Sequence, residues 1–249
     1  MTKIDFHNTC AIVLAAGKGT RMKAGNVNKV TLPIAGTPII IRIVTKLKDA
    51  GIKDIFVVVG HAKESVINLL GKSVNFVEQE EQLGTGHAVR VALSHVPKNF
   101  ENIFVFYGDD TSYDRQILEN LYKRHKKNNN CLSFLTIDIK DPTGLGRIKR
   151  DKEGRLIGII EEKDATKEEK MIKEVNPGCF IFKRWFLDKY IEELPKNKIT
   201  KEYYITDLIG MGIEKGEKVE GVKEKYTKWQ GFNTLEELQK ADKILQVKK

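Results

Sequence analysis

The sequence lacks the features that place a chain in a membrane or cross-link it through cysteines. No apolar run approaches the length of a membrane-spanning helix, and residues 1–8 are polar, without an apolar signal region. Its three cysteines, Cys10, Cys131 and Cys179, lie far apart and form no CxxC pair. We therefore expect no zinc site, and we expect the three cysteines to be buried and reduced. Together these absences predict a cytoplasmic protein without a membrane partner.

The chain also lacks a basic stripe with interleaved aromatic residues, although its formal net charge is +9. Lysines alternate with glutamates at residues 161–163 and 167–170, a pattern typical of a solvated face. We therefore predict no nucleic-acid partner, and a gel shift at physiological salt tests that alternative. Internal repeats and low-complexity tracts are absent as well, which excludes a repeat fold.

Strand-like and helix-like segments alternate through the first part of the chain. With 249 residues and 41% hydrophobic residues, the chain can bury a sizeable core. Strands are predicted at residues 10–14, 54–59, 74–77, 102–106 and 131–138, and helices at 38–50, 62–70, 86–95 and 114–127. This order predicts an α/β fold with a mainly parallel sheet and helices on both faces.

The second part has a different pattern and no linker before it. We predict a hairpin from residues 147–150 and 156–161, one strand over 174–182, and helices at 184–194, 205–215 and 234–247. This part is interpreted as a small lid grafted on the sheet.

Residues 14–22, LAAGKGTRM, directly follow the first predicted strand. Gly17 and Gly19 allow backbone N–H groups to approach an anion, and Arg21 can then clamp it. A Rossmann loop requires a third glycine where this chain has Met22, and the Walker pattern is missing. Because short glycine pairs also occur in ordinary turns, the segment is either a phosphate site or a simple strand–helix connection.

A second polar segment, residues 107–110 (YGDD), follows the predicted strand 102–106. Ligands of open α/β sheets bind beyond the carboxyl ends of the strands. The glycine-containing segment and YGDD are therefore predicted to meet in one cleft, which favours the phosphate interpretation.

Further motifs are QEEQLGTGHA at 79–88, DPTGLGRI at 141–148, IEEKDAT at 160–166, NPG at 176–178, EYYITD at 202–207 and GFN at 231–233. Together they resemble the sugar-1-phosphate nucleotidyltransferases, and most of all the uridylyltransferase domain of the bacterial GlmU family. The resemblance runs from about Cys10 to Asn233. It implies a Rossmann-like fold of the nucleotide-diphospho-sugar transferase type with a small β-rich sugar-binding lid. The implied divisions are a nucleotidyltransferase domain at 1–233, with its sheet core at 1–140 and sugar-binding part at 141–233, and a C-terminal helix at 234–249.

The resemblance implies Mg²⁺-dependent transfer of UMP from UTP to N-acetylglucosamine 1-phosphate, with release of pyrophosphate. The sugar phosphate is itself the nucleophile, so the protein must screen two polyanions and align them. Arg21 and Lys29 match the phosphate-binding cations of the family, and Asp109 and Asn233 match its Mg²⁺ ligands. Each also has a simpler interpretation. Arg21 can be a surface arginine and Lys29 a solvent-facing lysine. Asp109 can be a turn aspartate and Asn233 an asparagine near a helix N-cap.

The same resemblance implies the remaining binding residues. Those implied for the nucleotide are Leu14, Ala15, Ala16, Gly17, Gly19, Thr20, Gln79, Gly84, Thr85 and Gly108. Those implied around the sugar are Tyr107, Gly146, Glu161, Asn176, Tyr203 and Thr206. The amide of Gln79 can donate and accept, which suits uracil. His87 is interpreted as a packed helix residue because no step requires a base, and Tyr203 has apolar packing as its alternative.

Three positions depart from the family pattern. Asn28 replaces a common proline, which predicts a less stiff loop before Lys29. Residues 110–112 replace an apolar-proline-apolar run, and Pro177 replaces a common threonine. Alternatives therefore stay open: glucose 1-phosphate as the sugar, dTTP or CTP as the nucleotide, or a non-catalytic regulatory relative. No hexapeptide repeat follows Asn233, so neither a left-handed β-helix domain nor acetyl-CoA activity is expected. Without that domain, we expect a monomer or a dimer.

Overall fold

The computed structural model describes residues 4–19, 27–110 and 113–225. Several predictions fall outside these residues, namely those on Thr20, Arg21, residues 111–112, Asn233 and the C-terminal helix at 234–249. None of the helices in the described ranges has the length and apolar character that spanning a membrane requires.

In the described part of the chain, ten strands form one mixed sheet in the order β5-β4-β1-β6-β11-β7-β10-β8-β9, with β12 paired to β7. Its first half consists of β1 (Thr9–Ala15), β4 (Ile55–Val59), β5 (Asn75–Glu78) and β6 (Asn102–Tyr107), all paired in parallel. The predicted parallel sheet is confirmed there. A two-stranded ribbon of β2 (Pro33–Ile34) and β3 (Thr37–Pro38) lies apart from it.

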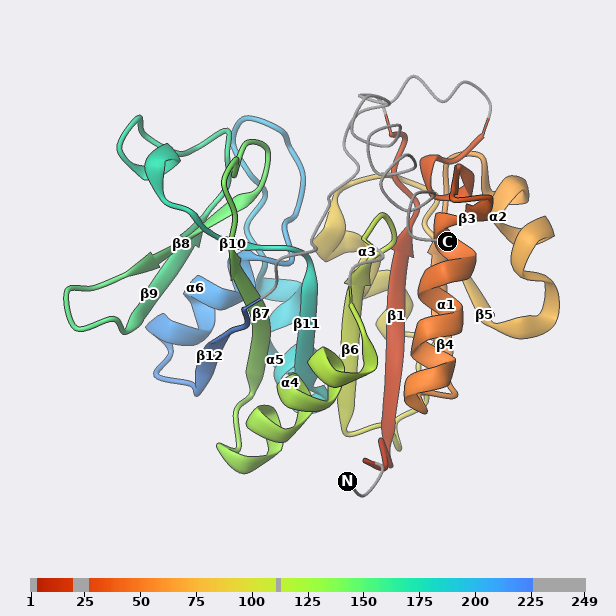
Figure 1. Ribbon diagram of the computed structural model, residues 1–249, viewed down its shortest axis with the longest axis horizontal. Helices are drawn as coiled ribbons and strands as arrows, with labels where there is room; N and C mark the ends of the chain where they lie inside the picture. The colour runs from red at the N-terminus through yellow and green to blue at the C-terminus, as the bar shows by residue number, and fades with distance from the viewer. Residues whose placement is uncertain (1–3, 20–26, 111–112, 226–249) are drawn as a thin grey trace.

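Helices cover both faces of the sheet (Figure 1), as predicted. One core contains residues of α1 (Ile39–Ala50), α2 (Lys63–Leu70) and α4 (Arg115–Lys127); the other contains residues of α3 (Thr85–Leu93), α5 (Arg184–Tyr190) and α6 (Asp207–Glu214). Alternate residues of β1 divide between them, since Ala11 and Val13 join the first core and Cys10 and Ile12 the second. A strand buried on both faces explains the continuous apolar run in the sequence.

The second half of the sheet is antiparallel, apart from β12, which is described below. β11 (Cys179–Lys183) lies between β6 and β7 (Leu132–Asp138), and β8 (Gly146–Arg150) forms a hairpin with β9 (Leu156–Ile160). That hairpin was predicted and is confirmed. Four 3₁₀ turns also lie in the described residues, at Lys29–Thr31, Gly71–Ser73, Glu169–Met171 and Ile191–Glu193.

The single strand predicted over residues 174–182 is wrong. The segment forms two strands, β10 (Glu174–Asn176) and β11, because Pro177 has no N–H for the ladder and Gly178 takes φ +95°. β10 pairs with β7 and β8, whereas β11 pairs with β6 and β7. The break therefore shifts the chain between two positions in the sheet.

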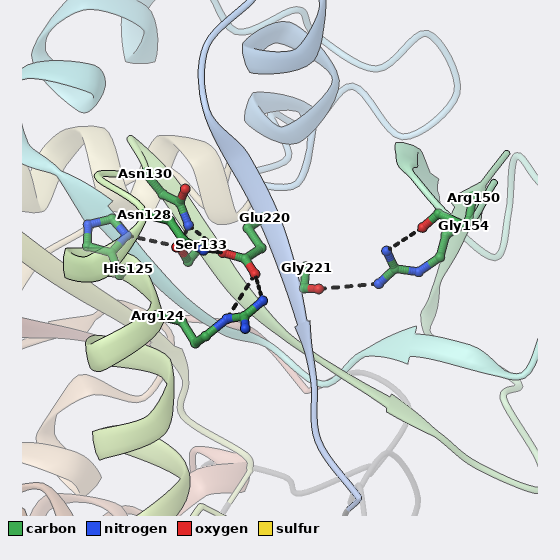
Figure 2. Close-up of polar contacts among 9 residues, drawn as sticks. All are labelled: Arg124, His125, Asn128, Asn130, Ser133, Arg150, Gly154, Glu220 and Gly221. Carbon is green, nitrogen blue, oxygen red and sulfur yellow. Dashed lines mark hydrogen bonds and ion pairs between the residues drawn. The ribbon is translucent and has the colours of Figure 1, made fainter.

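Strand β12 (Val219–Lys223) was not predicted, because its sequence VEGVK is short and half polar. It pairs in parallel with β7. Figure 2 shows Glu220 of β12 facing α4, where its carboxylate accepts hydrogen bonds from Arg124, Asn128 and Asn130. On the other side, Arg150 donates to the Gly221 carbonyl over 3.3 Å. These tertiary contacts stabilise a strand that its own sequence does not specify.

Replacing Gly178 with alanine is expected to lower the free energy of unfolding by about 2–4 kcal/mol. A Cβ there would lie 2.3 Å from Cδ2 of Tyr107, and the alanine would have to adopt φ +95°. Gly154→Ala is the matched control, because its φ is +80° but nothing lies within 4 Å, and it should cost only about 1 kcal/mol. Urea unfolding measures both. Equal losses in the two variants would contradict the close contact with Tyr107.

Candidate active site

A cavity of about 550 Å³ lies at the carboxyl ends of β1 and β6. It brings together most of the predicted site residues that the structure describes: Leu14, Ala15, Ala16, Gly17, Gly19, Lys29, Gln79, Gly84, Thr85, Tyr107, Asp109 and Glu161. The cavity lining does not include Gly108, Gly146, Asn176, Tyr203 or Thr206. The predicted convergence of the glycine-containing segment with YGDD is thus observed.

The segment 14–19 leaves β1 along one wall of the cavity. A Cβ on Gly17 would meet nothing within 4 Å, whereas one on Gly19, at φ +57°, would lie 3.1 Å from Cβ of Lys29. Gly19 therefore allows the segment to pass close to Lys29, and Gly17 leaves open space. A backbone without side chains beside a lysine is a suitable surface for phosphate.

Asn28 connects the segments around this wall. Its buried amide donates to the carbonyls of Ala15 and His61 over 2.8 and 2.9 Å, and its Oδ1 accepts from the Val30 N–H over 3.2 Å. Its own N–H donates to Ser65 Oγ over 3.1 Å. The sequence predicted a less stiff loop where proline is missing. Instead, hydrogen bonds to β1 and to the start of α2 replace the rigidity of a proline ring.

Lys29 and Asp109 form an ion pair in the cavity, with side chains 20% and 21% exposed. Asp109 is held by the turn after β6, where the Gly108 N–H donates to the Leu14 carbonyl over 2.9 Å. A Cβ on Gly108 would lie 2.5 Å from that oxygen, so glycine is required for the two strand ends to meet. A cation and a carboxylate from segments 80 residues apart are thereby placed within reach of one ligand.

The next wall comes from the QEEQLGTGHA motif. Gln79 is 3% exposed, and its Nε2 donates to the Gly84 carbonyl over 3.2 Å and lies 2.9 Å from Nδ1 of His87. Gly84 has φ +99°, and a Cβ there would lie 2.6 Å from the Tyr203 carbonyl. The His87 pKa is lowered, first by burial and then by Arg90.

The EYYITD motif docks directly on the start of α3. The Gly86 N–H donates to the Tyr203 carbonyl and the Tyr203 N–H to the Leu83 carbonyl, both over 2.8 Å, and the Ile205 N–H donates to Thr85 Oγ1 over 3.0 Å. Arg90 and Lys196 lie over the Tyr203 ring at 5.1 and 5.7 Å from its centroid. Tyr203 therefore joins the two motifs, while its neighbours Glu202 and Tyr204 line the cavity.

Acidic residues surround another part of the cavity lining. Glu161 lines the cavity and accepts a hydrogen bond from Thr206 Oγ1 over 2.7 Å, and burial raises the pKa of the Glu161 carboxyl. Burial and then Glu161 also raise the pKa of Asp207, to about 6. Asn176 is committed elsewhere, since its amide donates to the Leu135 carbonyl over 2.9 Å and accepts from the Gly178 N–H over 3.1 Å. A Cβ on Gly146 would lie 2.8 Å from Cδ1 of Ile159.

Replacing Asp207 with asparagine is expected to remove a pH dependence of stability. An unfolded aspartate loses its proton near pH 4, so between about pH 4 and 6 the folded chain holds more protons and stability falls as pH rises. The variant should gain about 1–3 kcal/mol of unfolding free energy at pH 7.5 and little at pH 4.5. Urea unfolding at both pH values measures this. Asp138→Asn, 57% exposed on β7, is the control; an unchanged slope for Asp207→Asn would contradict the raised pKa.

Several residues that line the cavity were not singled out as site residues from the sequence. They are Lys18, Val30, Gln82, Ala88, Gly144, Leu145, Glu202 and Tyr204. Most of them lie inside motifs that were recognised, so proximity to a motif was the available signal. Asp110 and Pro177, noted only as departures, also line the cavity. Lys18 adds a second lysine to the wall formed by the glycine-containing segment.

Comparisons with known proteins identify the family of the chain. The Nucleotidyl transferase family profile matches residues 10–246. The chain is similar to the bifunctional protein GlmU of Carboxydothermus hydrogenoformans, with 42% identity over 211 residues, 85% of this chain and 47% of that protein. It is also similar to the bifunctional protein GlmU of Clostridioides difficile, with 38% identity over 239 residues, 96% of this chain and 52% of that protein.

A solved structure shows the same fold. It is that of a Bacillus anthracis protein assigned as a glucose-1-phosphate thymidylyltransferase and crystallised with sucrose, with a TM-score of 0.80 and 24% identity over 95% of this chain and 94% of that one. The predicted fold class and the resemblance drawn from the motifs are both confirmed. The chain spans about half the length of the curated relatives it matches. Because the family profile covers nearly all of the sequence, this chain belongs to the nucleotidyl transferase family.

Proposed function

We propose that this chain transfers UMP from UTP to N-acetylglucosamine 1-phosphate and releases pyrophosphate. The observation that carries the proposal is the single cavity in which the glycine-containing segment, the Lys29–Asp109 pair, Gln79 and Glu161 meet. The relatives at 38–42% identity are bifunctional GlmU proteins, which supports this choice of reaction.

In the proposed reaction, a phosphate oxygen of the sugar 1-phosphate attacks the α-phosphorus of UTP. A new P–O bond forms, the bond between the α-phosphorus and the α–β bridging oxygen breaks, and that oxygen leaves with its electron pair as pyrophosphate. The nucleophile is already an anion, so no protein base has to remove a proton. The rate then depends on screening negative charge and on in-line alignment.

Residues of this chain supply both requirements. Lys29 exchanges its partner Asp109 for the triphosphate, and the backbone at Gly17 and Gly19 approaches the same phosphates. Arg21, which lies outside the described residues, is proposed as a further cation. Glu161, which also lines the cavity, accepts hydrogen bonds from sugar hydroxyls, and Thr206 orients its carboxylate.

The donors in this cavity suit Mg²⁺, which prefers hard oxygen ligands and takes one or two carboxylates together with substrate phosphates. Asp109 would hold the ion, with Asn233 from outside the described residues as its proposed second ligand. No cluster of three histidine, cysteine or acidic residues in the described ranges forms a separate metal site. When bound, the ion neutralises charge on the phosphates during transfer.

A panel of substrates tests the proposal. The purified chain is incubated with Mg²⁺, each of UTP, dTTP and CTP, and N-acetylglucosamine or glucose 1-phosphate, and pyrophosphate release is followed. The fastest turnover is expected for UTP with N-acetylglucosamine 1-phosphate. Turnover only with dTTP would overturn the uridylyl assignment, and no turnover with any pair would favour a non-catalytic relative.

Glucose 1-phosphate is the second candidate sugar. Asp110 and Pro177 both line the cavity and both depart from the family pattern, so they are the residues by which this chain would select a different sugar. Faster turnover with glucose 1-phosphate than with the N-acetylated sugar in the same panel would establish this alternative.

A further inference from the structure

The side chain of Gln79 is fixed in one orientation by its neighbours. The Gly84 carbonyl, 3.2 Å from the amide, can only accept a hydrogen bond, so the amide atom that faces it must be Nε2. The second hydrogen of Nε2 lies toward Nδ1 of His87 at 2.9 Å. Both donors of the amide are thus used inside the protein, and Oε1 has no hydrogen-bond partner among the described residues.

The contact with Gln79 also fixes the protonation of His87. Nδ1 accepts from the amide only if it carries no hydrogen, so the imidazole is neutral and protonated at Nε2. The lowered pKa of His87, caused first by burial and then by Arg90, agrees with this state. A positively charged His87 would present a donor to Nε2 and force the amide to turn over.

We propose that His87 is a specificity-determining positioning residue: its neutral Nδ1 holds the Gln79 amide so that Oε1 faces the cavity as an acceptor for the N3–H of uracil. The inference rests on the proposed function, since it requires a pyrimidine nucleotide in this cavity. His87 itself acts through Gln79 and does not contact the base.

The chemistry of the bases gives the expected selectivity. The Watson–Crick edge of uracil has one donor, N3–H, between two acceptors, so an outward-facing acceptor pairs with it. Cytosine has a lone pair at N3 and can offer its amino group to Oε1 only by shifting along its edge. Thymine has the same N3–H as uracil, so this device rejects CTP and leaves dTTP to other contacts.

The test compares two substitutions at His87. His87→Leu removes the acceptor, whereas His87→Asn places Oδ1 near the position of Nδ1 and can still accept from Gln79. For each variant and the original chain, kcat/KM is measured for UTP and for CTP with the same sugar phosphate and Mg²⁺. We expect the UTP/CTP ratio to fall about 10- to 100-fold in His87→Leu and to stay within about threefold in His87→Asn. The KM for the sugar phosphate should not change.

His95→Ala is the matched control, because His95 lies exposed just after the end of α3 and bonds only locally to Ser94 and Val91. If His87→Leu does not fold, the ratio in the original chain as a function of pH is the second readout, with the charge state of His87 followed by NMR in the same samples. Protonated His87 donates instead of accepting, so the ratio should fall as the pH is lowered through the His87 pKa, but not in His87→Asn. The charged groups that act on this titration are Arg90, Glu81 and Glu192, and they are the same in both chains.

The outcomes separate the two proposals. An unchanged UTP/CTP ratio in His87→Leu, or an equal fall in His87→Asn, would overturn the role of His87 while UTP remains the substrate. An original chain that prefers CTP would overturn the proposed function and this inference with it.

Discussion

Asp109→Asn is expected to lower kcat/KM for pyrophosphate release by about 10²–10³-fold at saturating Mg²⁺. The variant keeps the size of the side chain but removes the negative charge that would hold the ion, and it leaves Lys29 without its partner. The fold should persist, because the Asp109 side chain is 21% exposed and packs no core. Turnover against Mg²⁺ concentration, with far-ultraviolet circular dichroism, measures both points.

Asp138→Asn is the control for this experiment, because Asp138 is exposed at the end of β7 and pairs with Lys223 away from the cavity. Its kcat/KM should stay within about twofold. A chelator should abolish turnover in the original chain and in Asp138→Asn alike. Undiminished turnover in Asp109→Asn would show that the metal is held by other groups or is not needed.

Asn28→Ala is expected to lower the free energy of unfolding by about 2–4 kcal/mol and kcat/KM by about 10- to 100-fold. It leaves the buried carbonyl of Ala15, the partly buried carbonyl of His61 and the Val30 N–H without their present partners. It also releases the chain immediately before Lys29. Urea unfolding and steady-state kinetics measure the two effects.

Asn75→Ala is the matched control, since Asn75 also donates from its amide to a backbone carbonyl, that of Ile55, but over 3.5 Å and from an exposed position on β5. It should cost less than about 0.5 kcal/mol and leave kinetics unchanged. Similar losses in the two variants would mean that Asn28 contributes no more than a surface asparagine.

Much of the first half of the fold could be predicted from the sequence because local signals coincide there. The helix predicted at residues 38–50 is α1, with Pro38 at its N-cap and Gly51 at φ +108° as its C-cap. Strands buried on both faces are continuous apolar runs, as in β4. Such segments carry their own boundaries, so little tertiary information is needed.

The elements that were wrong or missed depend on distant partners. β12 is specified by β7 and by the residues that bind Glu220, and the break between β10 and β11 is set by where each strand pairs. In the site, the motifs predicted which segments meet, but not that Asn28 joins them or that His87 fixes Gln79. Those roles come from distances in the folded chain, from side chain to backbone for Asn28 and between side chains for Gln79 and His87, which no spacing in the sequence encodes. The metal and phosphate roles of Asp109, Asn233 and Arg21 stay predictions.

The ion pair of Lys29 with Asp109 makes the resting cavity locally electroneutral at this point. A nucleotide that binds alone pairs with Lys29 and leaves the Asp109 carboxylate unpaired beside a polyanion. A cation that binds alone pairs with Asp109 and leaves Lys29 unpaired. Only joint arrival compensates both charges. The triphosphate and the divalent ion should therefore each raise the affinity of the cavity for the other, because the ion pair of Lys29 with Asp109 competes with both.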